Sequence, residues 1–305
     1  MTLGALAADD VARRMAGQGL GLRLPPMTVR VRSPLASLAA QVHALYADAE
    51  VADASAYADI EVRMLPVRGT RAGGAQVQFV IDGATPFDAF PVAHALPMFE
   101  WGLNWVFTHR MNDHLMLHAA VVERDGRAVV MPAWPGSGKS TLSASLMCRG
   151  WRLLSDEFGI VSLTTMRLRP FVRPVGLKNA SIGVMRAYAP DAFIGPTFEG
   201  TRKGDVAHLR PSADSVARGA DAAEAAAIVF VDFRAGEPVE VQPLGPATTF
   251  LKLAGNAFNY EVVGEPGFRA VNALTRRSVA CILRYGELAD AHAAIDTLLA
   301  QGPRA

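Results

Sequence analysis

The stretch RAVVMPAWPGSGKSTLSASLMCRGWRLLSDEFGIVSL, residues 127–163, decides the fold of this chain. It passes from an apolar segment through a glycine-rich turn into a run of helix-forming residues, and then reaches an acidic pair. A strand that leads through such a turn into a helix is the unit with which many α/β proteins bind phosphate groups. The stretch therefore predicts an α/β protein with an anion-binding loop at its centre.

Residues 133–140, AWPGSGKS, follow the P-loop pattern G-x-x-x-x-G-K-[ST] except at the first position, which is alanine. The two glycines of the turn let backbone N–H groups point inward and cradle phosphate oxygens. The lysine can reach the β- and γ-phosphates, and the serine hydroxyl can ligate Mg²⁺. A tight glycine turn with a chance lysine is the alternative, but the flanking strand and helix favour nucleotide binding. The expected ATP-binding residues are Pro135, Gly136, Ser137, Gly138, Lys139, Ser140 and Thr141.

The acidic pair, Asp156 and Glu157, follows the segment GWRLLS. We expect a strand beside the P-loop strand to place this pair next to the bound phosphates, because open α/β sheets bind ligands at the carboxyl ends of their strands. One carboxylate can hold Mg²⁺, and the other can accept the proton of an attacking hydroxyl. The residues alone leave open which carboxylate does which. The alternative is an exposed acidic turn.

A basic segment, GTRKGDVAHLRP, lies further along the chain at residues 200–211. A mobile basic loop can close over a triphosphate and offset the charge that develops during phosphoryl transfer. The residues favoured for this role are Arg202 and Lys203, ahead of His208, whereas a solvated surface loop is the alternative. For Lys178 the sequence favours neither a role in the site nor the absence of one.

The composition limits the class of protein. Half of the 305 residues are hydrophobic and the net charge is +1, which favours a globular chain with no general attraction to nucleic acid or anionic lipid. The two cysteines indicate a reducing compartment, and Asp9 and Asp10 interrupt the place where a secretion signal needs its apolar core. These observations predict a cytoplasmic protein with neither a membrane nor a nucleic-acid partner.

The chain divides by texture into residues 1–95, expected to form a small α+β domain of unknown role, and residues 96–305, expected to form the P-loop domain. Periodicity in the first part predicts strands and one helix. In the second part we expect a helix from residue 96 that buries Phe99, Trp105 and Phe107. In the first part we also expect strands at 28–33, 58–67 and 75–83 and a helix at 35–48. In the second part we expect a strand pair at 114–132, a strand broken by the acidic pair at 151–163, and loops with short strands at 164–211. These are followed by a helical or flexible segment at 213–227, a buried strand at 227–236, a packing helix at 250–262 and a closing helix near the C-terminus.

A histidine, His118, stands in the apolar segment LMLHAAVV just before the loop. Alone, such a residue is more often a packed histidine than a functional one. The order of His118, PGSGKST and GWRLLSDE, however, resembles the catalytic domain of the HPr kinase/phosphorylase family. The loop is also similar to that of ATP-dependent phosphoenolpyruvate carboxykinases. Within the first family, the resemblance is greatest to the HPr kinase-related kinases of type A, which share TRKGDVAHLRP. It is convincing over residues 115–160 and weaker to about residue 285.

The resemblance implies a P-loop on a mixed sheet rather than on a parallel one. It implies ATP and Mg²⁺ as ligands, and transfer of the γ-phosphoryl group to a hydroxyl, often that of serine. By analogy Asp156 would be the general base, Ser140 and Glu157 would lie near the metal, and His118 would lie near the acceptor or the terminal phosphate. The analogy also implies a protein or peptide substrate and a homo-oligomer.

The chain departs from the family at two places. Thr141 stands where HPr kinases carry glutamate, and VGLKNASIG supplies Lys178 but no acidic residue. These departures argue against reverse phosphorolysis and against HPr as the substrate. Three hypotheses follow: a Mg²⁺-ATP kinase for a protein, peptide or small molecule; a carboxykinase-like lyase, for which no dicarboxylate site or second metal site is evident; and a nucleotide-binding regulatory module that needs no base.

Overall fold

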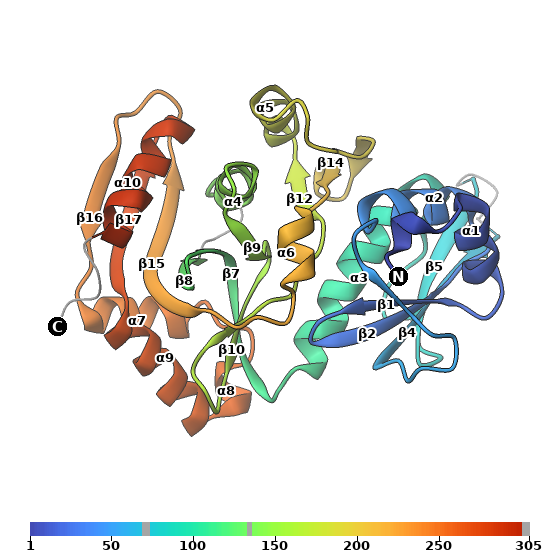
Figure 1. The fold of residues 1–305 in the computed structure, drawn as a ribbon, viewed down its shortest axis with the longest axis horizontal. Coiled ribbons are helices and arrows are strands. Elements are labelled where there is room, and N and C mark those ends of the chain that lie inside the picture. Colours follow the sequence, from blue (N-terminus) through green and yellow to red (C-terminus); the bar gives the residue numbers. More distant parts are fainter. Residues whose placement is uncertain (69–73, 133–135, 301–305) are drawn as a thin grey trace.

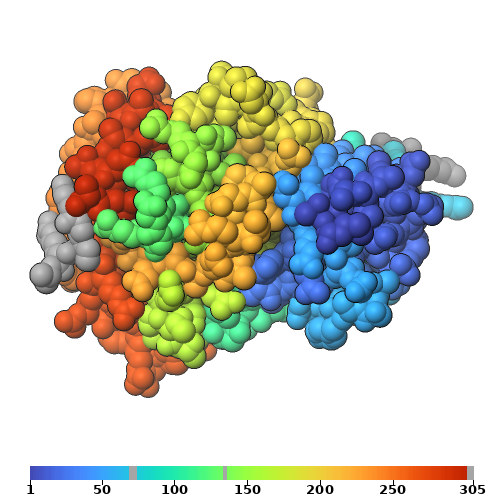
Figure 2. All heavy atoms as spheres, viewed as in Figure 1, coloured from blue at the N-terminus to red at the C-terminus, as the bar shows by residue number. Residues whose placement is uncertain are grey.

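The computed structural model describes residues 1–68, 74–132 and 136–300 and shows a mixed α/β protein with three sheets. The N-terminal residues form one lobe, at the right of Figure 1, and the remaining residues form the other lobe (Figures 1 and 2). Within the described ranges, no helix has both the length and the apolar composition to cross a membrane.

A six-stranded sheet with the order β3-β1-β2-β4-β5-β6 forms the centre of the first lobe. Alternation of buried and exposed residues along β4 and β5 shows that one face of this sheet packs on the core. The elements are η1 (Leu3–Ala5), α1 (Ala8–Ala16), β1 (Leu20–Leu24), β2 (Met27–Arg32), α2 (Ala36–Leu45), β3 (Glu50–Ala52), β4 (Ile60–Val67), β5 (Gln76–Ile81), β6 (Phe90–Pro91) and η2 (Val92–His94).

An eight-stranded mixed sheet forms the centre of the second lobe, with β9 paired to β7 beside the path β11-β10-β7-β8-β15-β17-β16. The strands β8, β15 and β17 are parallel, whereas β7 runs antiparallel to β8 and β16 antiparallel to β17. The expected mixed sheet is therefore confirmed. Its strands are β7 (His114–Arg124), β8 (Arg127–Pro132), β9 (Arg152–Ser155), β10 (Phe158–Ser162), β11 (Leu168–Arg169), β15 (Glu224–Phe233), β16 (Glu240–Pro243) and β17 (Val279–Tyr285).

A third sheet with the order β12-β14-β13 stands next to helix α4, which follows the P-loop, and α4 contacts both β12 and α5. The strands are β12 (Val175–Lys178), β13 (Phe198–Thr201) and β14 (Gly204–Leu209). The helices of the second lobe are α4 (Lys139–Cys148), α5 (Ala180–Tyr188), α6 (Ala213–Ala217), α7 (Pro246–Ala254), α8 (Tyr260–Val263), α9 (Glu265–Arg277) and α10 (Leu288–Ala300).

Helix α3 (Ala95–Arg110) lies between the lobes (Figure 1). Phe99 and Phe107 are fully buried as expected, in a core cluster that also holds residues of the N-terminal sheet. The expectation for Trp105 was wrong: its ring is only partly buried, because it lies at the rim, stacked on His109. The division after residue 95 stays a prediction.

Three expected segments differ from the structure. Residues 180–188, expected within a loop region, form α5, and only residues 213–217 of the expected helical segment are α-helical. The expected helix at 250–262 is two helices, α7 and α8, separated by a turn. The turn forms because the backbone N–H of Phe258 donates to the carbonyl oxygen of Met116 on β7, at 2.8 Å, and so leaves the helical pattern.

Candidate functional site

The glycine turn connects β8 to α4 and is held from outside by the ends of β15 and β17. The N–H of Phe233 donates to the carbonyl of Ser137 at 3.0 Å, and the Tyr285 hydroxyl donates to the carbonyl of Gly138 at 3.5 Å. Gly136 and Gly138 have φ values of +89° and +90°, which favour glycine. The turn therefore has a fixed backbone at its helix end. The expected contact residue Pro135 lies outside the described residues.

The ammonium of Lys139, at the first position of α4, is buried without a partner. The side chain is 6% exposed, and within the described parts of the chain Nζ makes no hydrogen bond. A buried charged donor without a partner has a substantial free-energy cost. An anion beside the N-terminus of α4 would satisfy it, and the helix dipole favours the same ligand. Ser140 and Thr141 follow in the first turn of α4 and are half-buried.

The acidic pair occupies a break in one long strand, as the sequence predicted. Strands β9 and β10 both pair antiparallel with β7, and Asp156 and Glu157 lie between them. The backbone continues to pair across the break, where the N–H of Ala119 donates to the carbonyl of Glu157 at 3.2 Å. The expectation that the strand carrying the acidic pair lies directly beside the strand before the glycine turn was wrong. The neighbour of β8 on this side is β7, and β9 pairs with β7. Because two antiparallel pairings restore the direction, β9 still ends at the same edge as β8.

The carboxylate of Asp156 is held by hydrogen bonds from two different elements. Its carboxylate accepts hydrogen bonds from the hydroxyl of Ser143 on α4 and from the backbone N–H of Gly176 on β12, each at 3.2 Å. Burial raises the pKa of Asp156, and the nearby charge of Lys139 lowers it in part. A carboxylate with a raised pKa accepts a proton more readily near neutral pH.

Glu157 and His118 lie opposite each other, with 3.7 Å between Oε1 and Nε2. Burial favours the protonated form of Glu157, but the nearby positive charges, first that of Lys139 and then those of Lys178 and Lys203, lower its pKa. Burial, and then the charge of Lys139, lowers the pKa of His118 to about 4. His118 is therefore a neutral imidazole at pH 7, and Glu157 stays ionised.

The aromatic neighbour of His118, Phe258, was not expected from the sequence. The ring of Phe258 lies 5.4 Å from the His118 ring, centroid to centroid, and Phe258 is 48% exposed. The turn that carries it is held by Asn259, whose amide oxygen accepts from the N–H of Met116 at 2.9 Å. The asparagines and the lone phenylalanine in GNAFNY were a signal for a turn in this segment.

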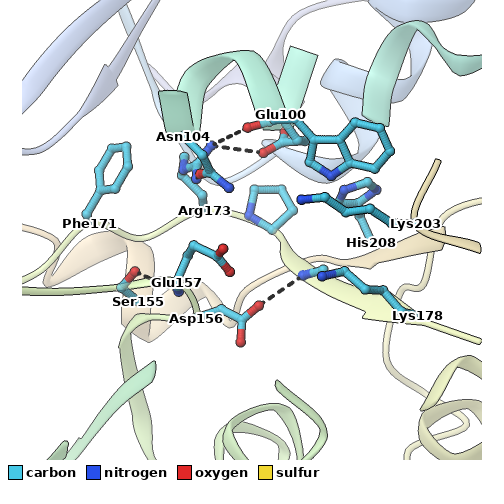
Figure 3. A pocket seen from close by; sticks show the side chains of 13 residues that line it. Glu100, Asn104, Ser155, Asp156, Glu157, Phe171, Arg173, Lys178, Lys203 and His208 are labelled. Atoms are coloured by element: carbon cyan, nitrogen blue, oxygen red, sulfur yellow. Dashed lines mark hydrogen bonds and ion pairs between the residues drawn. The ribbon is translucent and has the colours of Figure 1, made fainter. Parts of the chain in front are cut away.

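A pocket opens beside the acidic pair, between helix α3 and the third sheet (Figure 3). Of the basic residues expected in the site, Lys178, Lys203 and His208 line it. The structure does not bring Arg202 there: Arg202 lies over the ring of Phe90 and forms an ion pair with Asp88 at 3.7 Å. The other lining residues are Glu100, Trp101, Asn104, Ser155, Asp156, Glu157, Phe171, Arg173, Pro174 and Gly176.

A buried ionic network supports this pocket and was not expected from the sequence. Arg173 donates to the carboxylate of Glu100 at 3.2 Å and to the side-chain oxygen of Asn104, both on α3. The hydroxyl of Tyr46, from the first lobe, donates to Glu100 at 2.6 Å. Burial raises the pKa of Glu100, while the charge of Arg173 lowers it in part. A glutamate within the apolar sequence PMFEWGL was the only signal.

The residues present fit ATP and Mg²⁺. Mg²⁺ in nucleotide sites takes one or two carboxylates together with phosphate oxygens and water, not an all-protein cage. Accordingly, the described residues contain no group of three or more His, Cys, Asp or Glu side chains that could hold a metal by themselves. Ser140, Asp156 and Glu157 are the residues that would hold the ion together with nucleotide phosphates.

Comparison with known proteins adds no assignment, since no family model and no curated protein matches this chain.

Proposed function

We propose that the protein is a Mg²⁺-ATP-dependent kinase that transfers the γ-phosphoryl group to a hydroxyl, with serine of a protein or peptide as the favoured acceptor. The acceptor oxygen forms a bond to the γ-phosphorus as the bond to the β–γ bridging oxygen breaks. ADP leaves with that electron pair, and a carboxylate takes the hydroxyl proton. Bound Mg²⁺ would neutralise phosphate charge.

The observation that carries the proposal is the buried ammonium of Lys139, which has no partner among the described residues and lies close to the acidic pair. A lysine at the start of a helix after a glycine turn is suited to phosphate. Carboxylates next to a phosphate site are suited to a metal ion and to proton transfer, not to phosphate binding itself. Their combination favours transfer over binding alone.

The environments of the two carboxylates support a division of roles. Asp156, with its raised pKa, is the better proton acceptor, and its two hydrogen bonds fix its orientation. Glu157, with its lowered pKa, stays ionised and is the better cation ligand. This division agrees with the role that the family resemblance implies for each residue. His118, held neutral, can donate or accept a hydrogen bond near the acceptor without adding charge.

The test substitutes Asp156→Asn, which keeps the side-chain oxygen that accepts hydrogen bonds but removes the base. We expect transfer of label from [γ-³²P]ATP to acceptors in a bacterial lysate to fall about 10²–10⁴-fold, the usual contribution of a general base. The Kd of a fluorescent ATP analogue should change only a few-fold, roughly, because the loop and Lys139 remain.

Asp125→Asn is the matched control, because Asp125 is exposed in the turn between β7 and β8, at the opposite end of β8 from the glycine turn. Undiminished transfer by Asp156→Asn would remove Asp156 as the base. If the unmodified protein binds the analogue but labels no acceptor, it is a nucleotide-binding regulatory module. Label found only on small molecules would make it a small-molecule kinase.

A further inference from the structure

The pocket of Figure 3 lies beside the acidic pair. None of the described loop residues at positions 136–141 lines it, whereas Asp156 and Glu157 both do. Opposite them stands α3, whose labelled residues are Glu100 and Asn104 (Figure 3), and Trp101 of the same helix also lines the pocket. If phosphates lie at Lys139, a group in this pocket meets the acidic pair outside the loop, as a phosphoryl acceptor must.

Two lysines face the acidic pair from one side of this pocket (Figure 3). Lys178 ends β12, and Lys203 stands in the turn between β13 and β14, so that one small sheet fixes both. The Lys203 ammonium lies 4.9 Å from the centre of the Trp101 ring. Across the described residues, neither lysine forms an ion pair with a carboxylate within 4.0 Å. Burial and the charge of Lys178 lower the pKa of Lys203.

Unlike the two exposed lysines, two other polar groups of the pocket are buried and have no partner among the described residues. Nδ1 of His208 makes no hydrogen bond within the described chain, and His208 is 3% exposed. The same holds for Nε of Arg173, which is 7% exposed. Buried polar groups in native proteins are normally paired, so such orphans at a pocket wall indicate a ligand. Lysine and arginine side chains are donors only, and a neutral imidazole has one N–H, so the ligand that this set suits is an anion.

We infer that the phosphoryl acceptor carries a carboxylate close to its hydroxyl, and that Lys178 and Lys203 bind this carboxylate beside Trp101. The inference rests on the proposed kinase function and names the substrate class of the same site. The transfer step is unchanged: the acceptor oxygen bonds to the γ-phosphorus, ADP leaves, and the proton goes to Asp156. The carboxylate can belong to an acidic side chain next to serine or to the chain terminus of a peptide.

The test uses four synthetic serine peptides of equal length with [γ-³²P]ATP. One has glutamate after the serine and an amidated end, a second has glutamine there, a third has lysine there, and a fourth has glutamine and a free C-terminal carboxylate. A parallel set with alanine for serine, labelled with a fluorophore, gives Kd values by fluorescence anisotropy without any reaction. The first and fourth peptides distinguish the two sources of the carboxylate.

We expect at least one of the two carboxylate peptides to be labelled, and bound, about tenfold or more better than the neutral one, the effect of one charge-assisted contact. Lys178→Met and Lys203→Met should remove this preference, and Lys203→Arg should retain part of it. Lys252→Met, at an exposed lysine on α7, is the matched control and should keep the preference. Unchanged melting temperatures show that each variant is folded.

Four outcomes overturn the inference. They are equal labelling of neutral and acidic peptides, preference for the lysine peptide, retained preference in both methionine variants, and ATP binding without labelling or binding of any carboxylate peptide. A rise in the Kd of the ATP analogue in both variants, with unchanged peptide preference, would assign the lysines to the nucleotide. Failure of the unmodified protein to bind ATP at all would instead contradict the proposed function.

Discussion

The two glycines of the turn allow one prediction whose magnitude comes from the structure. Gly136 and Gly138 have nearly the same φ, +89° and +90°, so that alanine at either position has a backbone cost of about 1–2 kcal/mol. Their surroundings differ. A Cβ at Gly138 would lie 2.7 Å from Cβ of Phe233 and 2.9 Å from the Tyr285 hydroxyl, whereas a Cβ at Gly136 would meet no atom of the described residues within 4 Å. Overpacking of this kind costs about 1–3 kcal/mol more.

We therefore expect Gly138→Ala to destabilise the protein by about 2–5 kcal/mol and Gly136→Ala by about 1–2 kcal/mol. The difference between the two variants isolates the contact with β15 and β17. The assay is urea unfolding followed by circular dichroism, with both variants compared at one pH and without nucleotide. Equal losses, or a larger loss for Gly136→Ala, would refute the packing of the turn against Phe233 and Tyr285.

Three further changes test other parts of the molecule. Glu100→Gln removes the partner of the buried Arg173 and should cost about 3–5 kcal/mol in urea unfolding, whereas a loss below about 1 kcal/mol would show that the pair is not buried in solution. His208, with its pKa lowered by burial from 6.5 to about 3, takes up a proton in the unfolded state first. Its contribution to stability is complete above about pH 6.5 and is lost as the pH falls toward 3, so that His208→Gln should flatten the pH dependence of the melting temperature in this window. Under the proposed function we expect Mg²⁺-ATP to stabilise the unmodified protein by about 2.7 kcal/mol at a ligand concentration one hundred times Kd, and we expect Lys139→Met to abolish the resulting rise in melting temperature.

The fold could be predicted where one local pattern governs the backbone. The turn between β8 and α4, the interrupted strand around Asp156, and helix α3 all follow from short-range signals, and the structure contains each of them. The strand pair at 114–132 predicted β7 beside β8, but the mixed sheet was expected only by resemblance, since nothing local in the sequence states that β15 runs parallel to β8. Strand order depends on contacts between distant segments, and periodicity does not carry that information.

The site was harder to predict because many of the residues around it lie far in sequence from the loop and the acidic pair. The loop, the acidic pair and His118 were chosen from one stretch of the chain. Glu100, Trp101, Arg173 and Phe258 reach the same region from far away in sequence, as a core helix, a connecting segment and a turn. Arg202 and Lys203 show the limit of composition: they are neighbours in a basic run, but successive side chains point to different sides. Only one of them enters the pocket.

Helix α3 contributes to a hydrophobic core and to the pocket at once. Its buried residues Phe99, Leu103 and Phe107 belong to the cluster of the first lobe, while Glu100 holds Arg173 at the pocket and Tyr46 holds Glu100 from the other side. A protein cut before residue 95 would expose three large apolar side chains to water and would lose the hydroxyl that orients the glutamate. The first lobe is thus the scaffold against which this wall of the pocket is set, and under the proposed function we expect a shortened chain to retain ATP binding while losing the shape that selects the phosphoryl acceptor.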